Sequence, residues 1–154
     1  MLCQSKNRRL GMLDDLTNLQ ALLKDSTLLA TKGYIAGEWC DGENGQTFPV
    51  YNPARGDVIT DVADISRTQA AEAIAISEKA QKLWAARPAK ERSNLLRKWY
   101  NLMMENQEDF ATILTAEQGK PIEEAKGEIA YGASFIEWFA EEGKRVYGET
   151  IPGH

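Results

Sequence analysis

The sequence predicts an α+β fold in which a small antiparallel β meander, residues 34–64, precedes a mainly helical segment, residues 66–147. Two observations indicate this order. Short β-rich runs separated by turn residues fill the first range, and apolar residues at helical spacing between capping and terminating residues fill the second. No Pro-rich linker, repeat or low-complexity segment follows. We therefore expect a tail with a short helix over residues 1–29 and one domain part over residues 30–154.

The composition excludes several classes of protein. The chain has 154 residues, 43% of them hydrophobic, which suits one domain with a core. Its net charge of −5 argues against binding to nucleic acid or to anionic membranes, because clustered Lys and Arg dominate both interactions. No apolar run is long enough to span a bilayer. We expect a cytoplasmic protein that binds neither nucleic acid nor membrane.

The first 29 residues divide into two parts. Residues 1–11 contain three basic residues and no acidic one, which indicates either a targeting extension or, as the preferred interpretation, a disordered tail with Met12 as an alternative start. Leucines then recur at helical spacing over residues 13–29. This spacing predicts a short amphipathic helix that docks on a later element.

The predicted meander consists of two hairpins. Residues 34–40 form the first, because Ala36-Gly37 is a two-residue loop in which Gly adopts positive φ without steric cost. The β-rich runs 47–51 and 58–62 form the second, around a Pro- and Gly-containing turn. A polar loop connects the two hairpins.

The helical segment begins at a capping box. Ser66 is followed three residues later by Gln69, and Pro88 ends the helix. The residues predicted to form its buried stripe are Ala73, Ile76, Ala80, Leu83 and Trp84.

A second helix is predicted over about residues 89–105. Its apolar set is Leu95, Leu96, Trp99, Leu102 and Met103. The side chains predicted to point outward are those of Arg92, Arg97, Lys98 and Asn101. A short third helix follows and ends at Gly119.

A long helix over residues 121–147 is predicted to organise the fold and to lead into a strand. Pro121 occupies its first position, acidic residues its first turn, and Lys144 and Arg145 its last turn. The core-facing stripe is Ile122, Ala125, Ile129, Gly132, Ile136, Phe139, Gly143 and Val146. The second apolar stripe is Tyr131, Phe135 and Trp138. A helix this apolar needs partners on two sides.

The residues themselves predict no catalytic, cofactor or metal site. No Gly-rich phosphate loop is present, and neighbouring glutamates such as Glu123-Glu124 and Glu141-Glu142 are typical of a solvated helix face. Cys3 and Cys40 are most simply reduced thiols. Cys40 lacks a base, because the single histidine is His154 at the end of the sequence.

Several separate motifs nevertheless resemble the amino-terminal part of aldehyde dehydrogenases. They are Gly37-Glu38-Trp39, Tyr51-Asn52-Pro53 with Gly56-Asp57, Glu117-Gln118-Gly119-Lys120-Pro121 and Tyr147-Gly148-Glu149-Thr150-Ile151-Pro152. The segment 134–145 is similar to the succinate-semialdehyde dehydrogenase branch of that family. The resemblance covers about residues 28–154 and implies a fragment of an α/β enzyme.

The resemblance implies an oxidoreductase that converts succinate semialdehyde to succinate with NAD or NADP, and that forms homo-oligomers. The family's nucleophilic Cys, general-base Glu and nicotinamide-binding turn lie beyond the matching region. We therefore expect this chain alone to be inactive, to hold no cofactor and to self-associate through exposed apolar surface. Tyr131 and Phe135 are expected beside the aldehyde channel. The alternative hypothesis is a stand-alone, non-catalytic helical interaction module that binds a partner through the same aromatic stripe.

Overall fold

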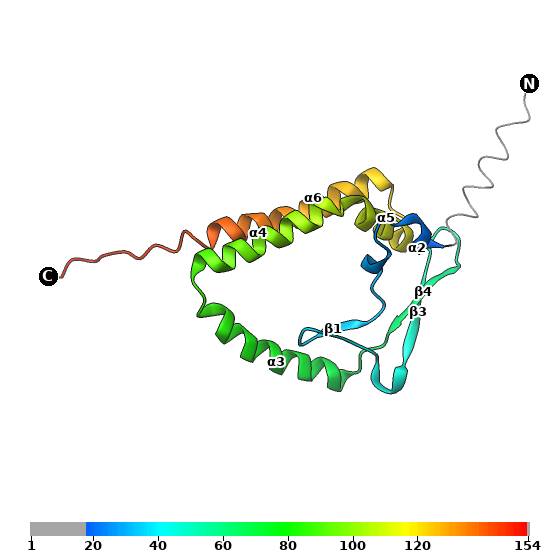
Figure 1. Ribbon diagram of the computed structural model, residues 1–154, viewed down its shortest axis with the longest axis horizontal. Coiled ribbons are helices and arrows are strands. Elements are labelled where there is room, and N and C mark those ends of the chain that lie inside the picture. Colours follow the sequence, from blue (N-terminus) through cyan, green and yellow to red (C-terminus); the bar gives the residue numbers. More distant parts are fainter. Residues whose placement is uncertain (1–17, 154) are drawn as a thin grey trace, which may run out of the picture.

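Short strands and longer helices are arranged around a ring in the computed structural model, which describes residues 18–153 (Figure 1). The elements are α2 (Leu19–Leu22), η1 (Ser26–Leu28), β1 (Gly33–Ile35), β2 (Glu38–Cys40), η2 (Glu43–Gly45), β3 (Thr47–Tyr51), β4 (Val58–Ala63), α3 (Arg67–Ala85), α4 (Ala89–Glu105), α5 (Gln107–Gln118) and α6 (Ile122–Glu142). The α4 and α6 helices pack side by side along one side of the ring, and α3 forms the opposite side. The predicted α+β class is confirmed. The tail predicted over residues 1–11, Met12, Cys3 and His154 lie outside the described residues.

The N-terminal segment docks on α5, but the prediction of one continuous helix up to Leu29 is wrong. Helix α2 ends at Leu22, and Leu23 is extended, with φ −85° and ψ 140°. The backbone N–H groups of Lys24 and Asp25, which a continuing helix would use internally, instead donate to Asp109. Residues 13–17 of the predicted helix are outside the described range. The buried residues of this segment, Leu19, Leu23 and Leu29, pack with the partly buried Ile59, Ile113 and Ala116.

The predicted strands form two hairpins that are separate two-stranded sheets. β1 pairs antiparallel with β2, and β3 pairs antiparallel with β4. The loop of the first hairpin is Ala36-Gly37, in which both residues have positive φ, 56° and 88°. This is the mirror-image turn whose twist suits a two-residue hairpin loop. Tyr34 and Trp39 face each other across that hairpin, with ring centroids 5.0 Å apart.

Helix α3 begins at the predicted capping box, but its predicted buried stripe is wrong. The Ser66 hydroxyl accepts a hydrogen bond from the N–H of Gln69, and the Gln69 side chain accepts one from the N–H of Ser66. No residue of α3 is buried, and Leu83 is 74% exposed. The reason is the position of α3, which lies across the ring from α4 and α6, so that no described helix covers its apolar side (Figure 1).

Helix α4 has the bounds that the sequence predicts and α5 ends where the sequence predicts, whereas α6 ends earlier than predicted. Gly119 ends α5 in the left-handed conformation, with φ 70°. Pro121 is the N-cap of α6 rather than its first residue, and Glu142 is its last, so Lys144 and Arg145 lie beyond the final turn. The strand predicted after α6 is wrong, because residues 145–153 form no strand. A strand forms through hydrogen bonds to a neighbouring strand, and no described strand pairs with this segment, whose residues are exposed to water.

The buried face of α6 is made of small residues, since Ala125, Ala133 and Ala140 are fully buried against the neighbouring helices. Four members of the predicted stripe are covered on this face: Ala125 is buried, and Ile129, Ile136 and Gly143 are half-buried. Phe139, which the sequence placed in the core, is 59% exposed. The fully buried positions in the second half of α6 are Ala133 and Ala140, the residues that follow the predicted Gly132 and Phe139. The other exposed members of the predicted stripe are Ile122, Gly132 and Val146.

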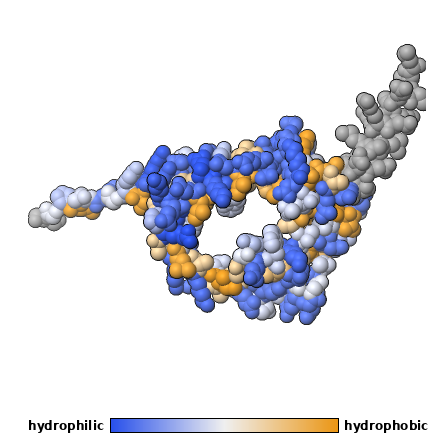
Figure 2. All heavy atoms as spheres, in the orientation of Figure 1, coloured by the Kyte–Doolittle hydropathy of each residue, from blue (hydrophilic) through white to orange (hydrophobic). Residues whose placement is uncertain are grey.

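Large apolar side chains remain exposed over much of the surface. No large side chain among the described residues is fully buried. Hydrophobic residues reach the surface along both sides of the ring (Figure 2). Over residues 18–153, none of the helices combines the length and the apolar character that crossing a membrane requires.

Candidate functional site

The aromatic stripe predicted on α6 lies on the face opposite the buried alanines. Tyr131, Phe135 and Trp138 are 66%, 49% and 61% exposed. The rings of Tyr131 and Phe135 contact each other edge to face, with centroids 4.9 Å apart and planes at 80°. The two residues that the sequence placed beside an aldehyde channel are therefore neighbours on one exposed helix face.

A groove lies beside the C-terminal half of α6, where α4 runs next to it. Its volume is about 630 Å³. The residues that line it are Arg97 of α4, then Ser134, Phe135, Glu137, Trp138, Phe139, Glu141 and Glu142 of α6, and Arg145. Of the two predicted channel residues, only Phe135 contributes to this wall. We call it the aromatic groove.

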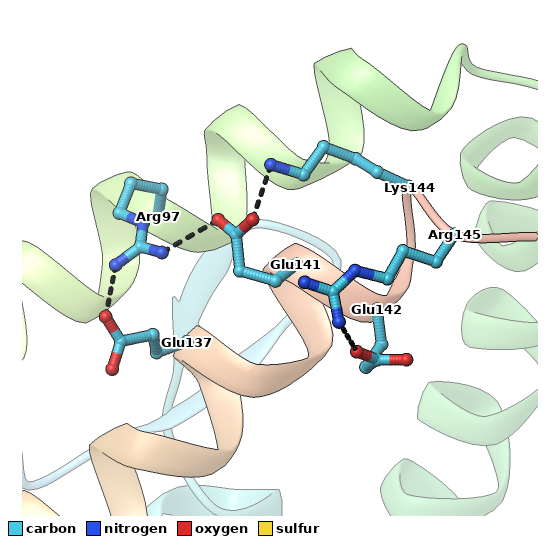
Figure 3. A network of polar contacts seen from close by, with 6 residues as sticks. All are labelled: Arg97, Glu137, Glu141, Glu142, Lys144 and Arg145. Atoms are coloured by element: carbon cyan, nitrogen blue, oxygen red, sulfur yellow. Dashed lines mark hydrogen bonds and ion pairs between the residues drawn. The ribbon is translucent and has the colours of Figure 1, made fainter.

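Charged residues of α4, of α6 and of the turn that follows α6 form a network along the aromatic groove (Figure 3). Arg97 donates to Glu137 at 2.5 Å and to Glu141 at 2.9 Å. The Nζ of Lys144 lies 2.7 Å from the second oxygen of Glu141, and Arg145 pairs with Glu142 at 2.7 Å. The prediction that Arg97 points outward is wrong. Glu137 and Glu141 are one helical turn apart, and a facing cation relieves the weak repulsion between them, but the sequence does not show which cation faces them.

The network shifts the ionisation of its members without leaving an unpaired charge on the groove wall. Hydrogen bonds to Glu137 and then to Glu141 raise the pKa of Arg97. Hydrogen bonds from Lys144 and then from Arg97 lower the pKa of Glu141. Both groups therefore stay charged at neutral pH, and each has a partner. The groove offers apolar surface between neutralised charges rather than an acid or base ready for catalysis.

We expect Arg97→Ala to lower the midpoint of thermal unfolding slightly, because it removes a partly exposed ion pair. Arg97→Lys should lower the midpoint less, because lysine keeps the charge, although it cannot bind two carboxylates as a fork. Since the pKa of Glu141 is held below its ordinary value near 4.5, this stabilisation is present above that pH and is lost as the pH falls through the lower folded-state pKa. The difference between wild type and Arg97→Ala should thus shrink from pH 7 to pH 3. Lys98→Ala, an exposed neighbour, is the control. A constant difference over this range would contradict the role of the network.

Cys40 lies in a place without the partners of a nucleophile. It is half-buried at the end of β2, and its thiol is 3.7 Å from the carbonyl oxygen of Glu38. No group of three His, Cys, Asp or Glu side chains suited to a metal ion occurs within residues 18–153.

The described glycines with positive φ do not form a dinucleotide-binding turn. They are Gly37 in a hairpin loop, Gly45 in η2, Gly56 between β3 and β4, and Gly119 at the end of α5. A dinucleotide turn needs glycines between a parallel strand and the start of a helix. All described strand pairs are antiparallel. Residues 18–153 therefore contain no turn of this kind, and no reaction step through a nicotinamide dinucleotide is assigned to them.

Comparison with known proteins adds information that the geometry alone lacks. A family described as "Aldehyde dehydrogenase family" matches residues 39–154. A glutarate-semialdehyde dehydrogenase of Pseudomonas putida is 58% identical over 132 residues, which cover 86% of this chain and 28% of that protein. A succinate-semialdehyde dehydrogenase (NADP+) of Escherichia coli is 54% identical, again over 86% of this chain and 27% of that protein.

A solved structure shares the fold as well as the sequence. The crystal structure of an E. coli NADP-dependent enzyme is 54% identical, with a TM-score of 0.82, over 86% of this chain and 27% of that one. The chain thus spans little more than a quarter of the length of the relatives that it matches.

Proposed function

Because the chain belongs to the aldehyde dehydrogenase family, we propose that it serves as the N-terminal portion of an NAD(P)-dependent enzyme that oxidises succinate semialdehyde to succinate. The observation that carries this proposal is the identity of 58% and 54% to two semialdehyde dehydrogenases along 86% of the chain. The same identity favours the enzyme over the alternative of a stand-alone interaction module.

The proposed substrate class follows from the names of these relatives. Succinate and glutarate semialdehydes each carry an aldehyde at one end and a carboxylate at the other, and they differ by one methylene. One methylene in a pocket changes specificity only modestly. We choose succinate semialdehyde because the segment 134–145 is similar to that branch, and glutarate semialdehyde is the nearest competitor.

The proposed contribution of this chain is to line the approach to the reaction centre. Tyr131 and Phe135 present an exposed edge-to-face aromatic pair on α6, a helix held by its packing on α4 and α5. Rigid aromatic side chains suit the wall of a substrate channel. The cofactor, the homo-oligomer and the cytoplasmic location inferred from the sequence stay predictions.

A fusion enzyme tests the proposal. The chain is joined to the part of the E. coli succinate-semialdehyde dehydrogenase that lies beyond the match, and NADP+ reduction is measured with succinate semialdehyde, glutarate semialdehyde and an uncharged aldehyde such as butanal. We expect the fusion to oxidise succinate semialdehyde best, butanal worst, and the unfused chain to oxidise none. A fusion that prefers butanal would contradict the proposed substrate class.

In the same fusion we expect Tyr131→Ala and Phe135→Ala to raise KM for succinate semialdehyde about tenfold each, because each removes an aromatic contact. Phe48→Ala is the matched control, since Phe48 is also 49% exposed but lies on β3. Unchanged KM values in both α6 variants would remove these two residues from the channel.

A further inference from the structure

The guanidinium group of Arg97 joins α4 to α6 as a fork. Its two terminal nitrogens donate to Glu137 at 2.5 Å and to Glu141 at 2.9 Å (Figure 3). These two glutamates lie about 6 Å apart along the axis of α6, and one guanidinium reaches both only when the two helices have a particular axial position. A slip of one turn, about 5.4 Å, would leave one carboxylate without this partner. The fork therefore specifies the register of α4 against α6.

The packing between α4 and α6 leaves much of this specification to the fork. The positions that the contact buries completely carry small side chains. Ser93 lies one turn before Arg97 on α4, and Ala133 and Ala140 lie one turn before and after Glu137 on α6. Helices fix their register by packing when large side chains interlock. A partly buried ionic contact can supply a register that packing by small residues does not.

Large apolar side chains on the second side of α4 do not anchor it on α6. Leu95, Trp99 and Leu102 recur there at steps of four and three, and they are 44%, 56% and 47% exposed. Trp99 is two residues after Arg97, so its side chain is turned by about 200° around the helix axis from the side that meets α6. The fork is thus the specific contact on the α6 side of this helix.

The first half of α6 is tied to α5 instead. The Nζ of Lys126 lies 2.9 Å from a carboxylate oxygen of Glu108, and the side chain of Gln107 donates to the backbone carbonyl of Lys126 at 2.9 Å. Tyr131 is about 7.5 Å and Phe135 about 13.5 Å further along the helix axis. With this point held and the fork lost, a shift of the second half of α6 grows with distance from the held point. Phe135 should therefore move more than Tyr131.

We propose that Arg97 is a positioning residue for the aromatic pair Tyr131 and Phe135, and that it acts by fixing the second half of α6 on α4. This inference rests on the proposed function, in which the pair lines the approach to the reaction centre. Arg97 shares the wall of the aromatic groove with Phe135, but its guanidinium is engaged by two carboxylates. Its effect reaches the substrate through the aromatic rings, so its loss should change KM and not kcat.

Kinetics of the fusion enzyme described above test the inference. We expect Arg97→Ala to raise KM for succinate semialdehyde about fivefold and to leave kcat within about twofold. Arg97→Lys should raise KM only about twofold, because lysine keeps the charge without the fork. Lys98→Ala is the matched control, since it removes an exposed cation from the next position, and it should leave both constants unchanged.

Double variants show through which ring Arg97 acts. In a Phe135→Ala background, Arg97→Ala should raise KM further by less than about twofold, because the ring that it positions is gone. In a Tyr131→Ala background, most of the fivefold effect should remain, because Tyr131 lies nearer the tie to α5.

Amide hydrogen exchange of the full, unfused chain reports the same contact without any activity. We expect Arg97→Ala to speed exchange at least about tenfold over residues 135–142 and to leave residues 123–130 unchanged. Lys98→Ala should change neither range. Circular dichroism checks that each variant keeps its helices.

Three results would overturn the inference: a KM that Arg97→Ala leaves unchanged, an equal rise in KM with and without the Phe135 ring, or unaltered exchange over residues 135–142. A fusion whose KM responds to Phe135→Ala but not to Arg97→Ala refutes the positioning and leaves the proposed function standing. A fusion inactive on every semialdehyde refutes the proposed function, and the exchange experiment then decides whether Arg97 fixes α6.

Discussion

Replacing Gly42 with alanine is expected to lower the free energy of unfolding by about 3 kcal/mol, because the new methyl group has no room. A Cβ atom at this position would lie 2.3 Å from the carbonyl oxygen of Gln46 and 2.5 Å from that of Asp64. Both are backbone atoms, and they are linked because the N–H of Asp64 donates to the Gln46 carbonyl at 2.9 Å. Relief of the clash therefore requires the chain between the two hairpins to move. Urea denaturation followed by circular dichroism measures the loss.

Gly45→Ala separates this steric effect from a conformational one. Gly42 has φ −59°, which alanine adopts freely, whereas Gly45 has φ 72° and open space, with no atom within 4 Å of the place that a methyl group would take. Gly45→Ala should thus lower stability by only about 1 kcal/mol, the cost of the left-handed conformation. Equal losses in the two variants would show that crowding at Gly42 is not the cause.

Asp109→Ala is expected to lower the free energy of unfolding by about 3 kcal/mol. Asp109 is 4% exposed, and its two carboxylate oxygens accept the backbone N–H groups of Lys24 at 3.0 Å and Asp25 at 2.9 Å. Hydrogen bonds to a charged acceptor are stronger than neutral ones. Their loss should release the segment that carries Leu23 and Leu29 from α5. Faster amide hydrogen exchange at Lys24 and Asp25 would report this release directly.

A graded series checks the role of the carboxylate. Asp109→Asn keeps one acceptor oxygen and turns the other into a donor that faces an N–H, so its loss should lie between those of wild type and Asp109→Ala. Glu72→Ala removes an exposed carboxylate from α3 and should leave both amides unchanged. Unaltered exchange at Lys24 and Asp25 in Asp109→Ala would contradict the proposed anchoring.

The elements were predictable where a local signal specifies them. The Ala36-Gly37 loop, the Ser66–Gln69 capping box and the Gly119 terminator all lie where the sequence placed them. Each depends on backbone geometry within a few residues. The predicted helix failed at residues 23–29, because the carboxylate of Asp109 accepts N–H groups that a helix would use internally. The predicted strand failed after Glu142, because a strand needs a partner strand there.

The candidate site was predictable only in part. The spacing of Tyr131 and Phe135 was enough to place both on one side of a helix that the sequence marked clearly, and they do contact each other. The aromatic groove was not predicted, because it depends on α4 lying beside α6. Arg97 was placed on the wrong side for the same reason, since its partners are 40 and 44 residues away in sequence.

By itself, then, the sequence determined the order of the elements, the turns and caps that bound them, and the family to which the chain belongs. Only the tertiary structure decided which faces are covered: the alanine face of α6 is buried, while α3 and the second side of α4 are not. The physical reason is that turns and caps are satisfied within a few residues. Burial requires a neighbour, and periodicity shows that a face is apolar without showing what lies against it.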